Sequence, residues 1–267
     1  MSEHSAWHLK GDMLSDFLSR MKGQKPPEYL IQDLLIPQRY LLLSGRTGLG
    51  KSLLATQQMF SFTTGKPWIG FQVKRCISLY MNFELPDFEL EKRLKLQGNG
   101  YLWDDFEPRV YSAPNNPPEN LKELESLIVD GPMPEVVIID SFRQVYRGKI
   151  NDNDEVAKWV QQLHGIAIRR NLAFVILQNT GKAKPFMERG AAEEAIGAFE
   201  LANRAVSVMV AVAQQKRGEH GHFGSKASDE IELHIPKYGA STRQLDTKYL
   251  KLNRETLVFE EQDSRWY

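Results

Sequence analysis

The sequence has 267 residues, which is long enough to bury a sizeable core in one α/β domain with a short additional segment. Hydrophobic residues make up 42% and charged residues 25%, which is ordinary for a globular protein and excludes disordered and fibrous classes. Lysine plus arginine and aspartate plus glutamate number 34 each, so the formal net charge is zero. This balance excludes a surface that is basic everywhere, but not local basic loops or a ring with a positive channel.

Cys76 is the one cysteine, so no disulfide forms within the chain, and the Cys and His spacing typical of metal sites is absent. The N-terminus is polar over residues 1–10 and carries no apolar run of signal length. No window approaches roughly 18 uninterrupted apolar residues, the length that would cross a bilayer. We therefore expect a cytoplasmic protein without a membrane span.

Residues 1–39 form a mixed leader, which we expect to be an N-terminal helical segment that packs on the core or on a neighbouring subunit. Apolar spacing over residues 7–20 suits a short surface helix, and the sequence Lys-Pro-Pro at 25–27 interrupts it. Residues 31–36 are apolar enough to lie against the core. Residues 40–267 are expected to form the main domain.

Apolar runs alternate with helical patterns through most of the main domain. We expect strands at 40–44, 77–83, 110 onward, 135–140 and 172–177, and helices at 51–62, 85–96, 121–129, 152–170 and 191–203. Further strands are expected at 205–213, 231–235 and 249–259. This order predicts an α/β fold with a mostly parallel sheet flanked by helices and extended by antiparallel C-terminal strands.

A phosphate-binding loop follows the first of these strands. The pattern G-x-x-x-x-G-K-[ST] lies between a predicted strand and a predicted helix, which is the context that the motif requires. Glycines let successive backbone N–H groups point at phosphate oxygens, and the helix adds its positive N-terminal end. We expect nucleotide contacts from Gly45, Arg46, Thr47, Gly48, Leu49, Gly50, Lys51, Ser52 and Leu53.

The loop implies ATP and Mg²⁺ as cofactors. Lys51 would reach the β and γ phosphates, and the Ser52 hydroxyl would ligate Mg²⁺. Mg²⁺ prefers oxygen ligands, and a carboxylate at the end of a nearby strand usually completes such a site. Asp140 ends the clearest strand of the chain and is therefore the predicted metal partner.

Hydrolysis also needs a group that orients or deprotonates water. Glu84 follows the strand at 77–83 and would emerge at the carboxyl edge of the sheet, so it is the predicted catalytic base. Asp87 and Glu89 compete for this role, but they lie inside a predicted helix and suit a solvated face. Gln178, with Asn179 and Thr180 beside it, ends the strand at 172–177 and would touch the γ-phosphate or the attacking water.

These residues resemble the RecA-like ATPases, in particular the RepA-type branch of small ring helicases and their AAA-like relatives. The resemblance covers roughly residues 30 to 215 and rests on five segments. They are 42–52, Gly65-Lys66-Pro67-Trp68-Ile69-Gly70, Leu79-Tyr80-Met81-Asn82-Phe83-Glu84, Ile138-Ile139-Asp140-Ser141 and Arg189-Gly190-Ala191-Ala192. The phosphate loop is shared with many families, whereas the segment 65–70 followed by the Glu84 strand is more particular.

The resemblance implies a RecA-like ATPase domain over 40–267, ATP hydrolysis at subunit interfaces, a hexamer-like ring or filament, and single-stranded DNA at its centre. Lys51, Ser52, Glu84 and Asp140 match the family pattern. The branch commonly has a pair of histidines where this chain has Gln178-Asn179. Lys237 lies where the family carries basic residues that act on the neighbouring subunit, and Arg243 could supply its arginine finger.

Two loops would face the channel of such a ring, at 142–154 and 181–194. Their basic residues could contact DNA phosphates; they are Arg143, Arg147, Lys149, Lys182, Lys184 and Arg189. Tyr146 and Phe186 could stack on bases. Acidic residues in both loops dilute this charge, and the alternative is that the loops are solvated and make subunit contacts.

We therefore predict an ATP-hydrolysing motor on single-stranded DNA, which is a homo-oligomer and has a possible replication or recombination protein as partner. The alternative is a nucleotide-gated oligomeric assembly or regulatory ATPase that recruits a protein partner without unwinding. The neutral charge and the absence of an appended DNA-binding domain motivate this alternative. A small-molecule kinase ranks last, because the sequence has no visible lid or acceptor site.

Overall fold

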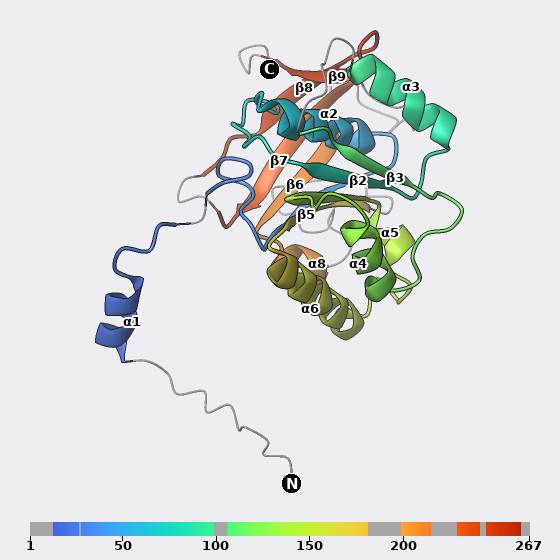
Figure 1. The fold of residues 1–267 in the computed structure, drawn as a ribbon. Coiled ribbons are helices and arrows are strands. Elements are labelled where there is room, and N and C mark those ends of the chain that lie inside the picture. The colour runs from blue at the N-terminus through green and yellow to red at the C-terminus, as the bar shows by residue number, and fades with distance from the viewer. Residues whose placement is uncertain are drawn as a thin grey trace.

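The structure is a computed structural model that describes residues 13–26, 28–98, 106–180, 199–214, 229–240 and 244–262. Over these residues the chain forms a nine-stranded sheet in the order β3-β2-β4-β5-β1-β6-β7-β8-β9 (Figure 1). The strands are β1 (Tyr40–Gly45), β2 (Ser78–Asn82), β3 (Arg109–Ser112), β4 (Val136–Asp140), β5 (Ala173–Asn179), β6 (Ser207–Ala213), β7 (Glu230–Tyr238), β8 (Lys248–Asn253) and β9 (Val258–Glu261). The helices are α1 (Leu14–Met21), α2 (Lys51–Thr64), α3 (Asp87–Gln97), α4 (Leu121–Val129), α5 (Phe142–Val145), α6 (Asn153–Arg170) and α8 (Phe199–Arg204).

The sheet has a parallel part and an antiparallel part. Strands β3, β2, β4, β5, β1 and β6 are parallel, whereas β7, β8 and β9 follow β6 in antiparallel order. The expected fold class is thus confirmed. In the parallel part, the ends of β1, β2, β4 and β5 lie at one edge, since Gly45 is in register with Asn179 and Asn82 with Asp140. This edge is where ligands bind in open α/β sheets.

Helices cover both faces of the sheet and enclose two apolar cores. Helices α2 and α3 lie on one face, and α4, α5, α6 and α8 lie on the other (Figure 1). The core under α2 includes Leu41, Tyr80, Ile138 and Leu177. The opposite core includes residues that alternate with these along the same strands, such as Ile176. Because successive side chains of a strand point to opposite faces, the near-continuous apolar strands fill both cores.

Polar side chains cap the N-termini of two helices on the second face, α4 and α6. The Asn120 side chain accepts hydrogen bonds from the backbone N–H groups of Lys122 and Glu123 and begins α4. Asp152 begins α6 in the same way. Glu125 of α4 binds Arg169 and Arg170 of α6 at 2.9 and 2.8 Å and so joins the two helices.

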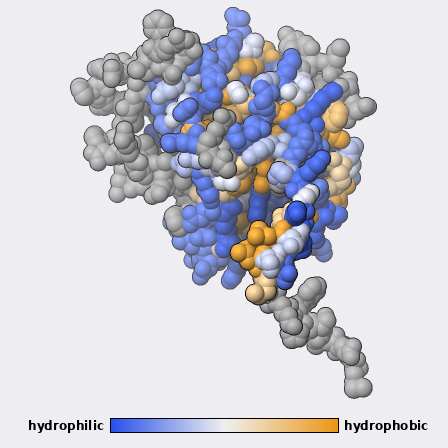
Figure 2. All heavy atoms as spheres, turned by 90° about the vertical axis from the view of Figure 1, so that its left-hand side faces the viewer, coloured by the Kyte–Doolittle hydropathy of each residue, from blue (hydrophilic) through white to orange (hydrophobic). Residues whose placement is uncertain are grey.

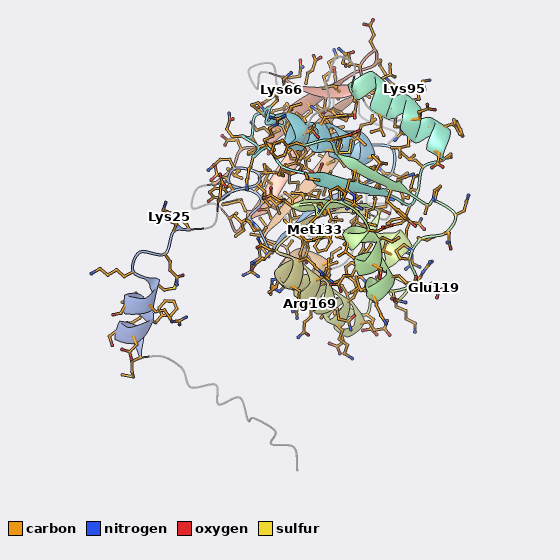
Figure 3. All side chains as sticks on the ribbon, viewed as in Figure 1. Lys25, Lys66, Lys95, Glu119, Met133 and Arg169 are labelled. Carbon is orange, nitrogen blue, oxygen red and sulfur yellow. The ribbon has the colours of Figure 1, made fainter. Side chains whose placement is uncertain are left out.

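The leader has two parts with different surroundings. Leu30, Ile31, Leu34 and Leu35 are buried in the core under α2. By contrast, no residue of α1 is buried, and the helix extends away from the body of the protein (Figure 1). Its apolar residues form an exposed patch (Figure 2), composed of Met13, Leu14, Phe17, Leu18 and Met21. Lys25 lies on the segment that joins α1 to the body (Figure 3). None of the helices in the described ranges is long and apolar enough to span a bilayer.

The C-terminal third departs from the sequence prediction. The single strand expected at 249–259 is two strands, β8 and β9, which form a hairpin. The polar residues between them turn the chain, because the Asn253 side chain accepts hydrogen bonds from the N–H groups of Glu255 and Thr256. The short helix α5 was not predicted. Of the helix expected at 191–203, the structure describes only the part in α8, and residues 191–198 lie outside the described ranges.

Candidate nucleotide site

The phosphate loop connects β1 to α2 at the carboxyl edge of the sheet, as the sequence predicts. Two of its glycines have little space around them. A methyl group on Gly45 would lie 2.7 Å from the carbonyl oxygen of Ala211 in β6. Gly50 has the left-handed φ of 77°, and a methyl group there would lie 2.6 Å from Cζ of Phe259. Both positions therefore require glycine for close approach, and Gly50 also requires it for its backbone conformation.

Lys51 is the first residue of α2, and only 6% of it is exposed. Its ammonium Nζ donates to the carbonyl oxygen of Arg46 at 2.8 Å, so the side chain lies along the inside of the loop. Burial lowers the pKa of Lys51 to about 8, against the opposing effect of the Asp140 and Glu84 carboxylates. An anionic group that entered the loop would favour the charged form and raise this pKa again.

This pKa predicts how nucleotide affinity depends on pH. Below the pKa of about 8 the ammonium is charged in the free protein, so affinity for ATP is independent of this group. Above this pKa the Lys51 amine is neutral and must take up a proton when ATP binds, so the affinity falls by up to about tenfold per pH unit. Titration calorimetry between pH 6.5 and 9.5 would measure this. Lys51→Arg is the control, because its guanidinium stays charged over this range, and an equal pH dependence in that variant would contradict the assignment.

Asp140 ends β4, and 1% of it is exposed. Its carboxylate accepts a hydrogen bond from the Tyr80 hydroxyl at 2.5 Å and another from the Ser52 hydroxyl. Burial raises the pKa of Asp140, an effect that these two donors oppose. A serine hydroxyl and a carboxylate in contact at the first turn of α2 are oxygen donors of the kind that Mg²⁺ prefers, so the residues fit the predicted metal.

Tyr80 is a partner of Asp140 that the sequence analysis did not single out. It is fully buried in β2, and burial together with the Asp140 carboxylate raises its pKa well above the ordinary value, so the phenol remains a donor. Tyr80→Phe removes that donor and leaves the buried carboxylate with one fewer partner. We expect a loss of about 1–3 kcal/mol in the free energy of unfolding. Urea denaturation would measure it, and an unchanged midpoint would show that the hydrogen bond contributes nothing.

Glu84 lies two residues beyond β2 and contacts Ser141, the residue after β4, and Asn179, the last residue of β5. Its Oε1 accepts from the Ser141 hydroxyl at 2.6 Å and from the Asn179 amide Nδ2 at 3.1 Å. The Asn82 side chain holds the turn that carries Glu84, since its Oδ1 accepts from the Leu85 N–H at 2.9 Å. The carboxylate is therefore fixed where β2, β4 and β5 end, beside the phosphate loop.

Of the polar residues that end β5, it is Asn179 that reaches Glu84. The strand continues to Asn179 rather than ending at Leu177, so side chains alternate through this segment. Asn179 shares the α2 face with Leu177, whereas Gln178 shares the opposite face with Ile176. Gln178 is 2% exposed, and its Oε1 has no hydrogen-bond partner among the described residues.

The predicted DNA-contacting residues are only partly described. Arg143, Arg147 and Lys149 are exposed around α5, and two of them bind their own chain: Arg143 donates to the Gly148 carbonyl at 3.1 Å and Arg147 to the Pro117 carbonyl at 3.4 Å. The residues Lys182, Lys184, Arg189 and Phe186 lie outside the described ranges.

Tyr146 is not available to stack on bases, contrary to the expectation. It is 4% exposed and stacks on Phe142 with ring centroids 4.9 Å apart. Trp159 of α6 meets both rings edge-on. The reason is that α5 turns the apolar side chains of this segment inward onto α6 and leaves its basic side chains outside.

Lys237, one of the two residues predicted to act on a neighbouring subunit, contacts its own chain. Its ammonium donates to the carbonyl oxygens of Ala202 and Asn203 at the end of α8. Its partner in register is Val208, near the start of β6, so Lys237 lies at the edge opposite the phosphate loop of its own chain. Arg243 lies outside the described ranges.

Comparison with known proteins gives one family and a common fold. A sequence profile described as an AAA domain matches residues 11–185. A DnaB-like replicative helicase, reported with its interactions with primase, aligns with a TM-score of 0.63 and 12% identity over 93% of this chain and 67% of its own. A KaiC-like protein from the hyperthermophilic archaeon Pyrococcus horikoshii OT3 aligns with a TM-score of 0.58 and 15% identity over 88% of this chain and 100% of its own. A comparison with curated protein sequences finds no significant match. These matches support a RecA-like P-loop ATPase and confirm the expected fold.

Proposed function

Because this chain belongs to the AAA domain family, we propose that it binds ATP with Mg²⁺ at the phosphate loop and hydrolyses it to drive a homo-oligomeric motor on single-stranded DNA. The observation that carries the hydrolytic part is the position of Glu84. Its carboxylate is held by donors from Ser141, directly after β4, and from Asn179 of β5, at the edge where the phosphate loop also lies. A base at that place faces the terminal phosphate of a nucleotide bound in the loop.

Each residue of the site has a role in this proposal. The ammonium of Lys51 binds the β and γ phosphates, and the backbone N–H groups of the loop donate hydrogen bonds to the phosphate oxygens. Ser52 and Asp140 hold Mg²⁺, which supplies charge neutralisation on the phosphates when bound. Glu84 orients the attacking water and takes its proton. Asn179 links Glu84 to the segment that follows β5, so the state of the nucleotide can reach that segment.

The motor part of the proposal is supported by the basic residues around α5. Arg143, Arg147 and Lys149 are exposed on the segment that follows Asp140, which is itself in the nucleotide site. The fold is shared with a protein described as a replicative helicase. We propose that the corresponding segment after β5 completes a channel for single-stranded DNA. We propose, from the motifs in the sequence, a motor of the RepA-type branch.

The homo-oligomer in this proposal is supported by α1. Its apolar side chains form an exposed patch, and none of the α1 residues is buried in the part of the chain that the structure describes (Figure 2). An isolated helix of eight residues is not stable in water by itself, so its apolar stripe needs a covering surface. We propose that a neighbouring subunit covers it, and that Lys237 and Arg243 act on that subunit's nucleotide.

A nucleotide-gated assembly protein is the second candidate, and the hydrogen bonds of Arg143 and Arg147 to their own chain favour it. Guanidinium groups that bind backbone carbonyls stabilise a loop and are less free to bind phosphates. In this case ATP would still drive oligomerisation, and the ligand of the assembly would be a protein rather than DNA.

ATP hydrolysis with and without single-stranded DNA, at low and moderate salt, would decide between these functions, together with the particle mass with ATP. We expect DNA to stimulate hydrolysis at least several-fold and the stimulation to weaken with salt, since phosphate contacts release counterions. Saturating DNA that neither binds nor changes the rate would exclude the motor. A larger particle with ATP and no response to DNA would then support the assembly protein.

A further inference from the structure

The C-terminal hairpin is formed by β8, β9 and the turn between them. It lies against α2, the helix that follows the phosphate loop. Phe259 of β9 is 2% exposed, and its ring is packed on Gly50, the residue directly before α2. Figure 1 shows the hairpin beside α2 at the same end of the sheet. A residue more than 200 positions away in the sequence therefore touches the loop that would bind phosphate.

Two glutamines attach the hairpin to the helices by hydrogen bonds to its backbone. Gln57 of α2 forms a pair of them with Phe259: its Nε2 donates to the carbonyl oxygen at 3.0 Å, and its Oε1 accepts from the N–H at 3.0 Å. The amide Nε2 of Gln97, at the end of α3, donates to the carbonyl oxygens of Leu53 at 3.0 Å and of Leu257 at 2.6 Å. The hairpin, α2 and α3 are thus joined directly around the phosphate loop.

A third contact fixes the other end of the hairpin. Lys248 of β8 and Glu261 of β9 form an ion pair at 2.6 Å, and this pair lies over Gly70, where a methyl group would be 2.6 Å from Glu261 Oε2. The Lys248 ammonium also lies 5.2 Å from the centre of the Phe71 ring. The contacts therefore run along the whole hairpin, from the Gly70 turn to the Gly50 end of α2.

We propose that this hairpin is a positioning element for the phosphate loop, with Phe259 and Gln57 as its positioning residues. Glycine at position 50 has wide conformational freedom, and a loop with several glycines samples many shapes when it is empty. The Phe259 ring occupies the space next to Gly50, and the paired hydrogen bonds of Gln57 hold the ring there. The loop N–H groups are then already oriented before a phosphate arrives, which reduces the ordering that binding requires.

This inference rests on the proposed ATP binding, and it predicts which kinetic constant changes. Loss of the hairpin contact would weaken ATP binding, because an empty loop would have to be ordered on binding. The rate at saturating ATP would change little, since Glu84 and its partners Ser141 and Asn179 do not contact the hairpin residues named here. A purely structural role would instead lower thermal stability and leave the dissociation constant of the folded protein unchanged.

The test uses the full chain with Phe259→Leu, which removes the ring but keeps an apolar side chain, and Gln57→Ala, which removes both hydrogen bonds. Glu255→Gln is the matched control, because Glu255 is exposed in the hairpin turn and its side chain makes no contact with α2 that the structure records. Titration calorimetry with a non-hydrolysable ATP analogue and Mg²⁺ gives the dissociation constant. Steady-state hydrolysis gives KM and kcat, and melting temperatures without nucleotide show that each variant is folded.

We expect about a tenfold higher dissociation constant and KM in both variants, with kcat within about twofold and the control unchanged. The double variant should bind ATP no more weakly than the single variant with the lower affinity. The reason is that both substitutions disrupt the same contact of the hairpin with Gly50. An unchanged dissociation constant in folded Gln57→Ala would overturn the proposal, even if Phe259→Leu failed to fold. A wild-type chain that does not bind the analogue would refute the proposed function instead, so the two failures are distinguishable.

Discussion

Glu84→Gln is expected to leave ATP binding intact and to reduce the rate of hydrolysis by about two to four orders of magnitude. A glutamine at this position keeps an oxygen that can accept from Ser141 and Asn179, so the local geometry is retained. It has no basic carboxylate to take a proton from water. The variant should therefore accumulate in its ATP-bound state.

Single-turnover hydrolysis and an ATP-binding titration would test this separation of binding from chemistry. Glu89→Gln is the matched control, because Glu89 lies on the nearby helix α3, where it pairs with Arg93 at 3.8 Å across one helical turn. We expect normal turnover in that variant. If Glu84→Gln retained near-normal turnover, the assignment of the catalytic base would be wrong, and Asp87 or Glu89 would have to be reconsidered.

Lys51→Ala is expected to abolish productive ATP binding, with the dissociation constant raised by about 100-fold. The ammonium of Lys51 is buried inside the loop, where it can meet phosphate oxygens in place of the Arg46 carbonyl. A charge-assisted hydrogen bond of this kind contributes about 1.5–3 kcal/mol, and Lys51 would make contacts to two phosphate groups. Alanine removes all of them and leaves a gap.

Titration calorimetry with ATP and Mg²⁺ would measure this loss. Lys95→Ala is a suitable control, because Lys95 is exposed on α3 (Figure 3) and pairs with Glu91 one turn away. It should bind ATP as the unmodified chain does. Binding by Lys51→Ala with unchanged affinity would show that the phosphates lie elsewhere.

Local signals in the sequence predicted most of the elements and the core of the site. Helix α4 has the predicted bounds Leu121–Val129, and β4 ends at Asp140 as expected. The reason is that apolar periodicity and the phosphate-loop pattern are short-range properties, each contained in a few neighbouring residues. The strand–loop–helix context of Lys51 and Ser52 was therefore predictable without any long-range contact.

The contacts of Glu84 were not predictable in the same way. The position of Glu84 at the edge of the sheet followed from the strand before it, but its partners are Ser141, which follows β4, and Asn179 of β5. Asn179 rather than Gln178 reaches Glu84 because β5 continues through both residues, so their side chains point to opposite faces of the sheet. The residue at which a strand ends is poorly predicted from the sequence.

The contacts of Tyr146 and Phe259 also depended on tertiary packing. Tyr146 carried a sequence signal for base stacking, yet it stacks on Phe142 because α5 packs against α6. Phe259 carried no signal for a role at the site, since it only ends a predicted strand and meets Gly50 only after the chain folds. Contacts between residues so far apart have no counterpart in a sequence pattern.

The sequence by itself determined an α/β chain with the pattern of a phosphate loop, a candidate metal-binding carboxylate and a candidate base, because each of these depends on residue type and spacing over a short segment. The tertiary structure decided which groups surround that base and that the C-terminal hairpin packs beside the loop. It did so because the order of strands in a sheet brings residues from opposite ends of the chain to one edge.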